Sequence, residues 1–214
     1  NFWVTLPSGT EKRVNLDGAD GQTDMWQIVS GGAAQSVYTI TAQKGPTEFY
    51  ATGLPTGLTV SLSSGLISGK TAAVGDHNVT ISASNLSGSS PTQTLVISVL
   101  PIAPLVTDVN TTNVGGTSAV ANFKLRDTGG DDATLTLFYG TSDGNVTVAN
   151  WEGNVTISGA QAAGDQSEAL AGLVVNTAYF ARVRASNSAG DAWSENAHTF
   201  TTNAVVGPPV VATA

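Results

Sequence analysis

The stretch ATGLPTGLTVSLSSGLISG, residues 51–69, decides how this 214-residue chain folds. Short apolar runs alternate in it with four glycines, namely Gly53, Gly57, Gly65 and Gly69. Glycine reaches positive φ angles that other residues resist, so it is expected where a chain reverses between strands. The stretch therefore predicts several short strands joined by tight turns.

Two alternating segments follow this stretch. Between Asn78 and Asn85 the apolar side chains occupy every second position, at Val79, Ile81 and Ala83. The same period places Leu95, Ile97 and Val99 on one face of a later segment. A period of two predicts half-buried β-strands whose apolar faces line a core.

Residues 51–69, 78–83 and 85–88 together resemble the bacterial putative-Ig (cadherin-like) repeat, whose pattern reads roughly ATGLPxGLxxxxxxGxISGxPxxxGxxxVTVxAxNxxG. That module is a β-sandwich strung along large secreted and surface proteins. The resemblance implies an Ig-like sandwich over residues 24–100.

The sequence LVVNTAYFARVRASNSAG, residues 173–190, resembles a fibronectin type III module. It matches the family's LxxxTxYxxxVxAxNxxG stretch, with Tyr179 in the place of the tyrosine corner. Alternation places Tyr179 and Val183 inward and Phe180, Arg182 and Arg184 outward. Further strands are expected at 119–126 and 133–140. YGTSDG at 139–144, together with the tryptophans near 151 and 193, resembles a variant of this module repeated in very large bacterial surface proteins.

The expected fold class is all-β, with two tandem antiparallel β-sandwiches, Ig-like and then fibronectin type III-like. Residues 1–23 are expected to form a β-hairpin or strand segment, and 24–100 the first sandwich. Pro101–Pro104 is a short proline linker that we expect to be stiff. Residues 105–203 form the second sandwich, and 204–214 begin a further module or are a strand donated to a neighbour.

Composition excludes some function classes. The chain has a net charge of −8 and only eight Lys and Arg residues, which argues against a nucleic-acid binder. It contains no cysteine, which fits an exported bacterial protein and equally a cytosolic domain. No apolar run approaches the length of a membrane span and no signal peptide is visible, so no membrane insertion is expected. Because the chain begins at Asn1 without Met, we expect a mature form or a piece of a longer protein.

Catalysis is poorly supported by the sequence. The two histidines, His77 and His198, fall in different modules, one just before a strand and the other in the expected last strand. No GxSxG elbow lies near either of them. The acidic corner at 127–132 is interpreted as a hairpin loop. We therefore expect a protein that is not an enzyme and has no cofactor.

An acidic loop at 15–24 is a candidate calcium site. Asn15, Asp17, Asp20 and Asp24 offer oxygen ligands separated by glycines, which suit a hard cation. The spacing differs from that of an EF-hand loop, and the alternative is a solvated turn.

Four tryptophans, at positions 3, 26, 151 and 193, are candidates for an aromatic platform that binds carbohydrate. Trp151 and Trp193 are the preferred pair, because each is expected beside a loop with polar neighbours. The alternative is that both pack within the framework of the module. Phe180 is expected to be covered by side chains of a neighbouring strand, and Lys124 to point outward.

The favoured function is a non-catalytic structural or adhesive module of an extracellular bacterial surface or secreted protein. One alternative is the subunit of a surface fibre assembled by strand addition, and another is a carbohydrate-binding accessory module. The expected partners are neighbouring modules, copies of the same chain, a glycan or a host or cell-surface ligand.

Overall fold

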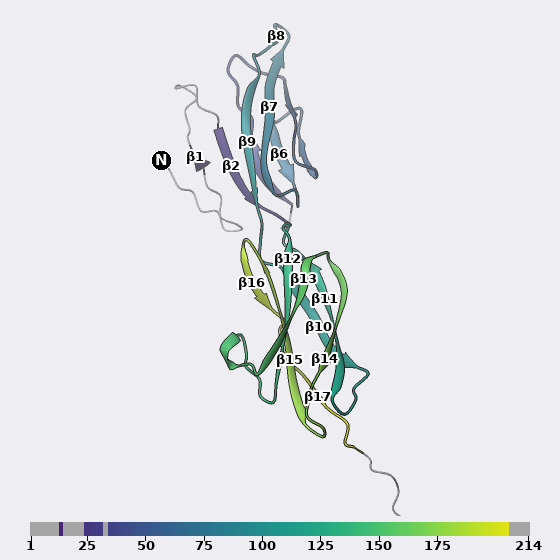
Figure 1. Ribbon diagram of the computed structural model, residues 1–214. Helices are drawn as coiled ribbons and strands as arrows, with labels where there is room; N and C mark the ends of the chain where they lie inside the picture. Colours follow the sequence, from purple (N-terminus) through teal and green to yellow (C-terminus); the bar gives the residue numbers. More distant parts are fainter. Residues whose placement is uncertain (1–12, 15–23, 32–33, 206–214) are drawn as a thin grey trace, which may run out of the picture. The chain divides into compact units, whose positions relative to one another are not determined.

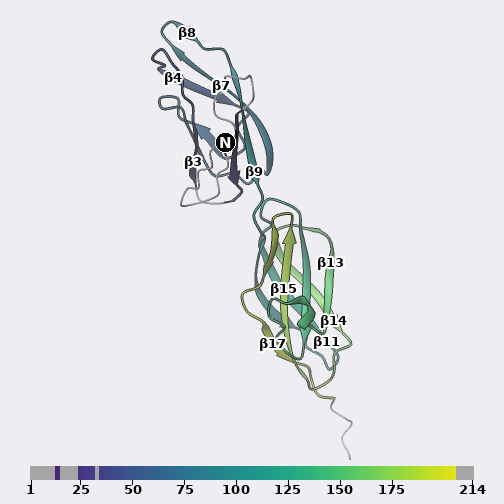
Figure 2. The same ribbon diagram turned by 90° about the vertical axis from the view of Figure 1, so that its left-hand side faces the viewer.

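The computed structural model of the protein describes residues 13–14, 24–31 and 34–205, and within them it contains two compact units. The first unit extends to Ile102 and also includes residues 129–131. The second unit contains the other described residues from Ala103 onward. Figures 1 and 2 show that both units are built almost entirely from strands, and the described residues form one short 3-10 helix.

The first unit contains two sheets. The larger one has the order β1-β2-β9-β7-β4, with β8 paired to β7, and the smaller one has the order β3-β6-β5. The strands are β1 (Arg13–Val14), β2 (Asp24–Val29), β3 (Gln35–Thr39), β4 (Glu48–Thr52), β5 (Leu58–Val60), β6 (Leu66–Gly69), β7 (Gly75–Asn85), β8 (Gly88–Ser89) and β9 (Gln93–Leu100).

Both sheets of the first unit contribute to one core. The alternations expected in β7 and β9 are confirmed, because these side chains are buried: Val79, Ala83, Leu95, Ile97 and Val99. They pack with Val37 and Ile67 of the smaller sheet. Apolar residues on facing sheets thus enclose the core of a β-sandwich.

Two details of the first unit differ from the expectation. The pairing of β2 with β9 is parallel, whereas the other strand pairs of this unit in the described residues are antiparallel. A parallel pair needs no tight turn, and here β2 and β9 are the early and late strands of the unit. His77 lies inside β7 and not before it, since the strand already begins at Gly75.

Two glycines of the stretch 51–69 are required where backbones meet. Gly57 has φ +93° and Gly69 has φ +140°, both within the range that L side chains rarely adopt. A Cβ atom on Gly57 would lie 2.0 Å from the carbonyl oxygen of Lys70, and one on Gly69 would lie 2.2 Å from that of Gly57. The turn before β5 and the end of β6 can therefore approach each other only without side chains.

The second unit also contains two sheets. One has the order β10-β11-β14, and the other has the order β13-β12-β15-β16, with β17 also paired to β15. The strands are β10 (Leu105–Thr112), β11 (Ser118–Asp127), β12 (Ala133–Gly140), β13 (Gly153–Gln161), β14 (Gly164–Ala171), β15 (Ala178–Asn187), β16 (Gly190–Trp193) and β17 (His198–Thr201), and the 3-10 helix η1 spans Val148–Asn150.

The inward alternation expected in β15 is confirmed, since these side chains are at most 5% exposed: Tyr179, Ala181, Val183 and Ala185. They pack against Phe123 and Leu125 of β11 and Leu135 and Leu137 of β12. The interpretation of 127–132 as a hairpin loop is wrong. The segment joins β11 to β12, which belong to different sheets, so it crosses between the layers.

Tyr179 makes the hydrogen bond expected of a tyrosine corner. Its hydroxyl oxygen accepts a bond from the backbone N–H of Val174 at 3.1 Å, and Leu173 beside it is buried. Thr177 and Thr202 join the same corner, because the hydroxyl of Thr202 accepts a bond from the backbone N–H of Thr177. The turn before β15 is therefore held to the core by side chains.

Tyr179→Phe is expected to lower the free energy of unfolding of the second unit by about 1 kcal/mol. The ring packing remains, but the part-buried N–H of Val174 loses its acceptor. The change in the free energy of unfolding is measured by chemical denaturation, with hydrogen exchange of residues 173–187 as the probe. Phe180→Tyr serves as a control because it adds a hydroxyl on the opposite face of β15, and equal stability of Tyr179→Phe and wild type would contradict the role of the hydroxyl.

Candidate functional site

The expected calcium ligands give no testable geometry. Asn15, Asp17 and Asp20 lie outside the described residues, and Asp24 is described only as the first residue of β2. Within the part of the chain that the structure describes, no group of three or more His, Asp or Glu side chains could hold a metal ion. The calcium site stays a prediction.

The structure brings Trp151 and Trp193 together on the outer face of the second unit's larger sheet. Both rings contact Phe138, with ring centroids 6.4 Å away for Trp151 and 4.9 Å away for Trp193. The loop that connects β12 to β13, residues 141–152, carries Trp151 over this face, and we call this loop the strap. Phe138 is 1% exposed although its side chain does not belong to the main core.

Trp151 itself is only 9% exposed. Its indole N–H donates to the carbonyl oxygen of Asn145 at 3.1 Å, so the strap is closed by its own tryptophan. A Cβ atom on Gly144 would lie 2.7 Å from the indole ring, which explains why glycine stands there. The Trp151 ring thus presents little area for stacking, whereas Trp193 is half-buried.

Arg182 lies beneath the same strap. It points to the outer face of β15 as expected, yet it is only 9% exposed. Its guanidinium forms an ion pair with Asp143 at 3.3 Å and donates to the carbonyl oxygens of Ser194 and Glu195 at 3.0 and 3.2 Å. A buried guanidinium needs such partners, because an unpaired buried charge is costly. Arg182 therefore holds the strap and the β16–β17 loop to the sheet.

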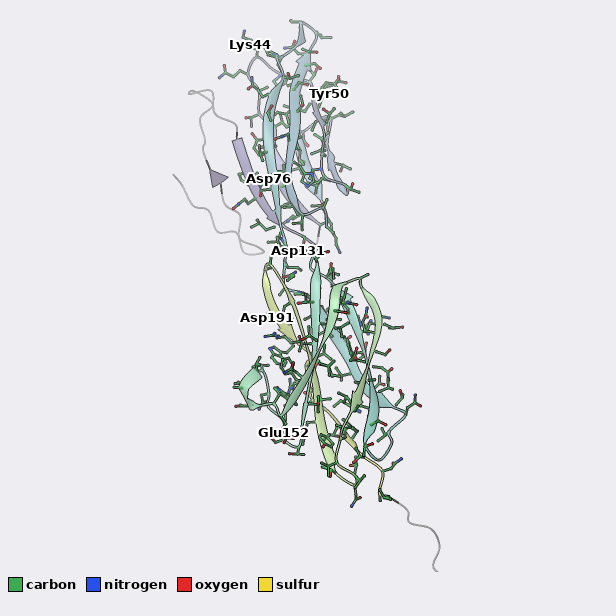
Figure 3. All side chains as sticks on the ribbon, in the orientation of Figure 1. Lys44, Tyr50, Asp76, Asp131, Glu152 and Asp191 are labelled. Atoms are coloured by element: carbon green, nitrogen blue, oxygen red, sulfur yellow. The ribbon has the colours of Figure 1, made fainter. Side chains whose placement is uncertain are left out.

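Arg184 extends the cluster toward solvent. Its guanidinium carbon lies 5.6 Å from the centroid of Phe138 and 5.9 Å from that of Trp193, and it pairs with Asp191 at 3.4 Å. Asp191 is labelled on β16 in Figure 3. The half-buried ring of Trp193 beside a cation and a carboxylate is the part of this cluster that a polar ligand can reach.

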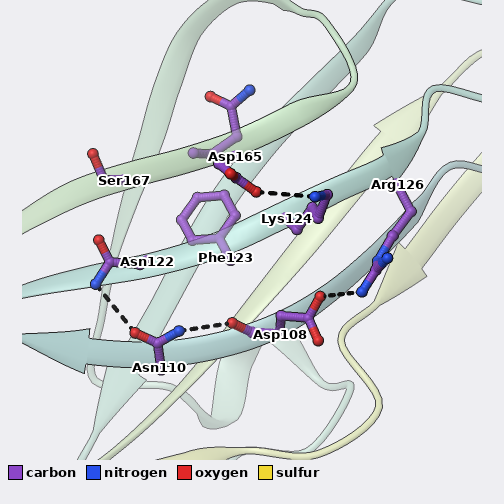
Figure 4. Close-up of a pocket in the computed structure, with 9 residues that line it drawn as sticks. Asp108, Asn110, Asn122, Phe123, Lys124, Arg126, Asp165 and Ser167 are labelled. Atoms are coloured by element: carbon purple, nitrogen blue, oxygen red, sulfur yellow. Dashed lines mark hydrogen bonds and ion pairs between the residues drawn. The ribbon is translucent and has the colours of Figure 1, made fainter.

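A second polar surface covers the outer face of the second unit's smaller sheet (Figure 4). A shallow depression of about 510 Å³ lies over β10, β11 and β14, and its lining is polar except for Phe123. Lys124 pairs with Asp165 across β11 and β14 at 3.3 Å, which confirms that Lys124 points outward. The side-chain amide of Asn122 donates to Asn110 at 3.2 Å.

Asp108 and Arg126 form the other ion pair of this face, at 2.5 Å. The pKa of Asp108 lies below its ordinary value because its carboxylate accepts hydrogen bonds from Thr107 and Arg126. Asp108 has a positive φ of 59°, and the pairing of β10 with β11 shifts register beside it. Because both side chains are about half exposed, water screens the pair and it adds little stability.

The sequence did not point to this polar face. Its residues alternate with core positions on three strands, so each looks like an ordinary solvent-facing residue. The signal that could have found them is the opposite charge of Lys124 and Asp165, but their pairing depends on the register of β11 with β14.

The two histidines lie in different units, and each imidazole makes a hydrogen bond within its own unit. Nε2 of His77 contacts the carbonyl oxygen of Ala73 at 2.8 Å, and Nε2 of His198 contacts the hydroxyl of Thr111 at 3.0 Å. Burial lowers the pKa of His198 from its ordinary value. Both imidazoles thus have structural hydrogen bonds.

All four cationic side chains of the second unit are paired with carboxylates. Two of these ion pairs lie on the unit's smaller sheet, and the other two lie near Phe138 on its larger sheet. The same unit carries nine Asp and Glu residues. A phosphate backbone is bound through clustered and available cations, and the expectation that the chain does not bind nucleic acid stays a prediction.

The fold defines both units as β-sandwich modules of the Ig-like and fibronectin type III class. Residues 26–100 match the model of the Putative Ig domain family, so this part of the chain is similar to that family. A search of curated proteins gave no match. No helix in the described residues is long and apolar enough to cross a membrane.

Many solved structures are similar to the chain. The FN1–FN3 domains of chicken CNTN1 are 18% identical, with 83% of this chain and 65% of that chain covered and a TM-score of 0.36. The sensor domain of the anti-sigma factor RsgI4 of Pseudobacteroides cellulosolvens is 16% identical, with 51% and 99% covered and a TM-score of 0.36. The third fibronectin III domain of the human KIAA0343 protein is 22% identical, with 51% and 90% covered and a TM-score of 0.36.

Proposed function

We propose that the chain is a non-catalytic structural or adhesive segment of an extracellular surface or secreted protein, in which two sandwiches act in series. The observation that supports this most directly is that each unit encloses its own apolar core. Ig-like and fibronectin type III folds are generally non-catalytic modules, and function on such folds depends on particular surface sites.

Pulling the full chain by its two ends tests the structural role. Two separate unfolding events are expected, because the units have separate cores. A unit of about 100 residues should release about 350 Å of chain at about 3.5 Å per residue. One event that releases the whole chain, or extension without any resisting event, would contradict two modules that bear load in series.

The carbohydrate-binding alternative is supported by the position of Trp193, which lies half-buried beside Arg184 and Asp191. A glycan array probed with wild type and with Trp193→Ala tests it. Binding that Trp193→Ala loses and Trp26→Ala retains would support this alternative, since Trp26 lies in the other unit. An absence of binding by wild type would remove it.

A further inference from the structure

The second unit contains a long neutral segment in an acidic chain. Residues 144–164 carry a single ionisable side chain, Glu152, whereas the whole chain has 24 Asp, Glu, Lys and Arg residues. Glu152 accepts hydrogen bonds from the backbone and hydroxyl of Thr141, which hold its pKa below the ordinary value. The segment comprises most of the strap and the strand β13, and we call it the neutral edge.

β13 is an edge strand with a free side. It pairs with β12 and with no other strand of the described residues. On the side away from β12, alternate residues present backbone N–H and C=O groups that a further strand can pair with. Val155 and Ile157 point toward the core and remain half-buried, while Asn154 and Thr156 on the opposite face are exposed.

Other edges of this unit carry the features that prevent strand addition. β14 has Asp165 and Glu168, and β10 has Asp108 at positive φ with two register shifts. β16 and β17 are four residues each. Charges, irregular backbone and short length all discourage pairing with a foreign strand. β13 has neither charge nor proline, and its register shift and the positive φ of Gly159 lie at its far end, beyond Ile157.

The strap extends the same surface. Val146 is 59% exposed and Val148 is 45% exposed, although Trp151 between them and β13 is buried. Exposed apolar residues are typical of the centre of a protein interface.

We propose that β13 is a self-association edge, at which a second copy of this chain adds its own β13 in antiparallel orientation. A copy is the occupant because β13 is uncharged and antiparallel pairing lets two copies of an edge strand meet, although the two chains each carry a net charge of −8. They can approach without opposing carboxylates where the neutral edge meets itself. A two-fold pairing centred on Val155 places this residue opposite its copy and Thr156 opposite Asn154, so each half-buried valine covers the other.

A charge-exchange experiment at Thr156 tests the proposal. Sedimentation of the full chain from about 1 to about 500 μM should show wild type passing from monomer to dimer. Thr156→Lys alone and Thr156→Glu alone should each weaken dimerisation at least about tenfold, because the two like charges then occupy diagonal positions on one face of the strand pair, within reach of each other. An equimolar mixture of the two variants should recover dimers, which only pairing of β13 with β13 explains.

Ser167→Lys on β14 is the matched control, since it adds the same charge to an exposed position on another edge strand. It should dimerise like wild type. Wild type that remains monomeric over the whole range would overturn the proposal. So would Thr156 variants that dimerise unchanged, equal loss in the Ser167 control, or a mixture that stays monomeric.

Discussion

Gly57→Ala is expected to destabilise the first unit by about 4 kcal/mol or more. The added Cβ would stand 2.0 Å from the carbonyl oxygen of Lys70, which is backbone and cannot rotate away. In addition, φ at Gly57 is +93°, where alanine is strained. Relief of the clash requires the turn before β5 to separate from the end of β6.

Gly75→Ala distinguishes the effect of the steric clash from that of backbone strain. Gly75 also has a positive φ, of +118°, but no heavy atom lies within 4 Å of its expected Cβ position. This control should cost about 1–3 kcal/mol from backbone strain alone. Urea unfolding followed by hydrogen exchange in β7 and β9 measures both variants. Equal losses would show that the close approach of Lys70 contributes nothing.

Trp151→Ala is expected to cost the second unit about 3–5 kcal/mol, as is usual when a buried aromatic ring is removed. The variant loses the contact with Phe138 and leaves the carbonyl oxygen of Asn145 without its indole donor. It also uncovers Arg182, whose burial depends on the strap. Hydrogen exchange should increase in the strap and in β15.

Two further variants make this result specific. Val148→Ala removes an exposed side chain from the same strap and should change the free energy of unfolding by less than about 0.5 kcal/mol. Trp151→Phe keeps an aromatic ring against Phe138 and loses only the N–H, so its loss should be intermediate. If Trp151→Ala unfolds like Val148→Ala, the strap is not held by its tryptophan.

Strands were predictable from the chain wherever one face is buried. The alternation in β7, β9 and β15 identifies the buried face of each strand, because every second side chain must enter the core. The same rule misjudged the environment of Arg182. It correctly placed this side chain on the outer face, but outer faces are normally solvated and here the strap covers one. The strap has no period of two, since a 3-10 turn and a residue with positive φ, Asn145, shape it.

The residues of the candidate sites were likewise predictable by type but not by arrangement. Trp151 and Trp193 were singled out by residue type, but their meeting at Phe138 depends on the pairing of β12 with β15 and of β15 with β16. The polar face of the smaller sheet depends in turn on the register of β11 with β10 and β14. The register between strands that are distant in the chain cannot be predicted from the local sequence of either strand.

The amino-acid sequence by itself therefore determined the all-β class, the positions of most strands, the two-sandwich organisation and the buried Tyr179 corner. These features rest on local rules, namely side-chain alternation, glycine at reversals and short motifs. Only the tertiary structure decided which outer faces are covered, which charges are paired and which strand edge stays free. Those properties arise between segments that are distant in the chain, and packing of the whole unit selects them.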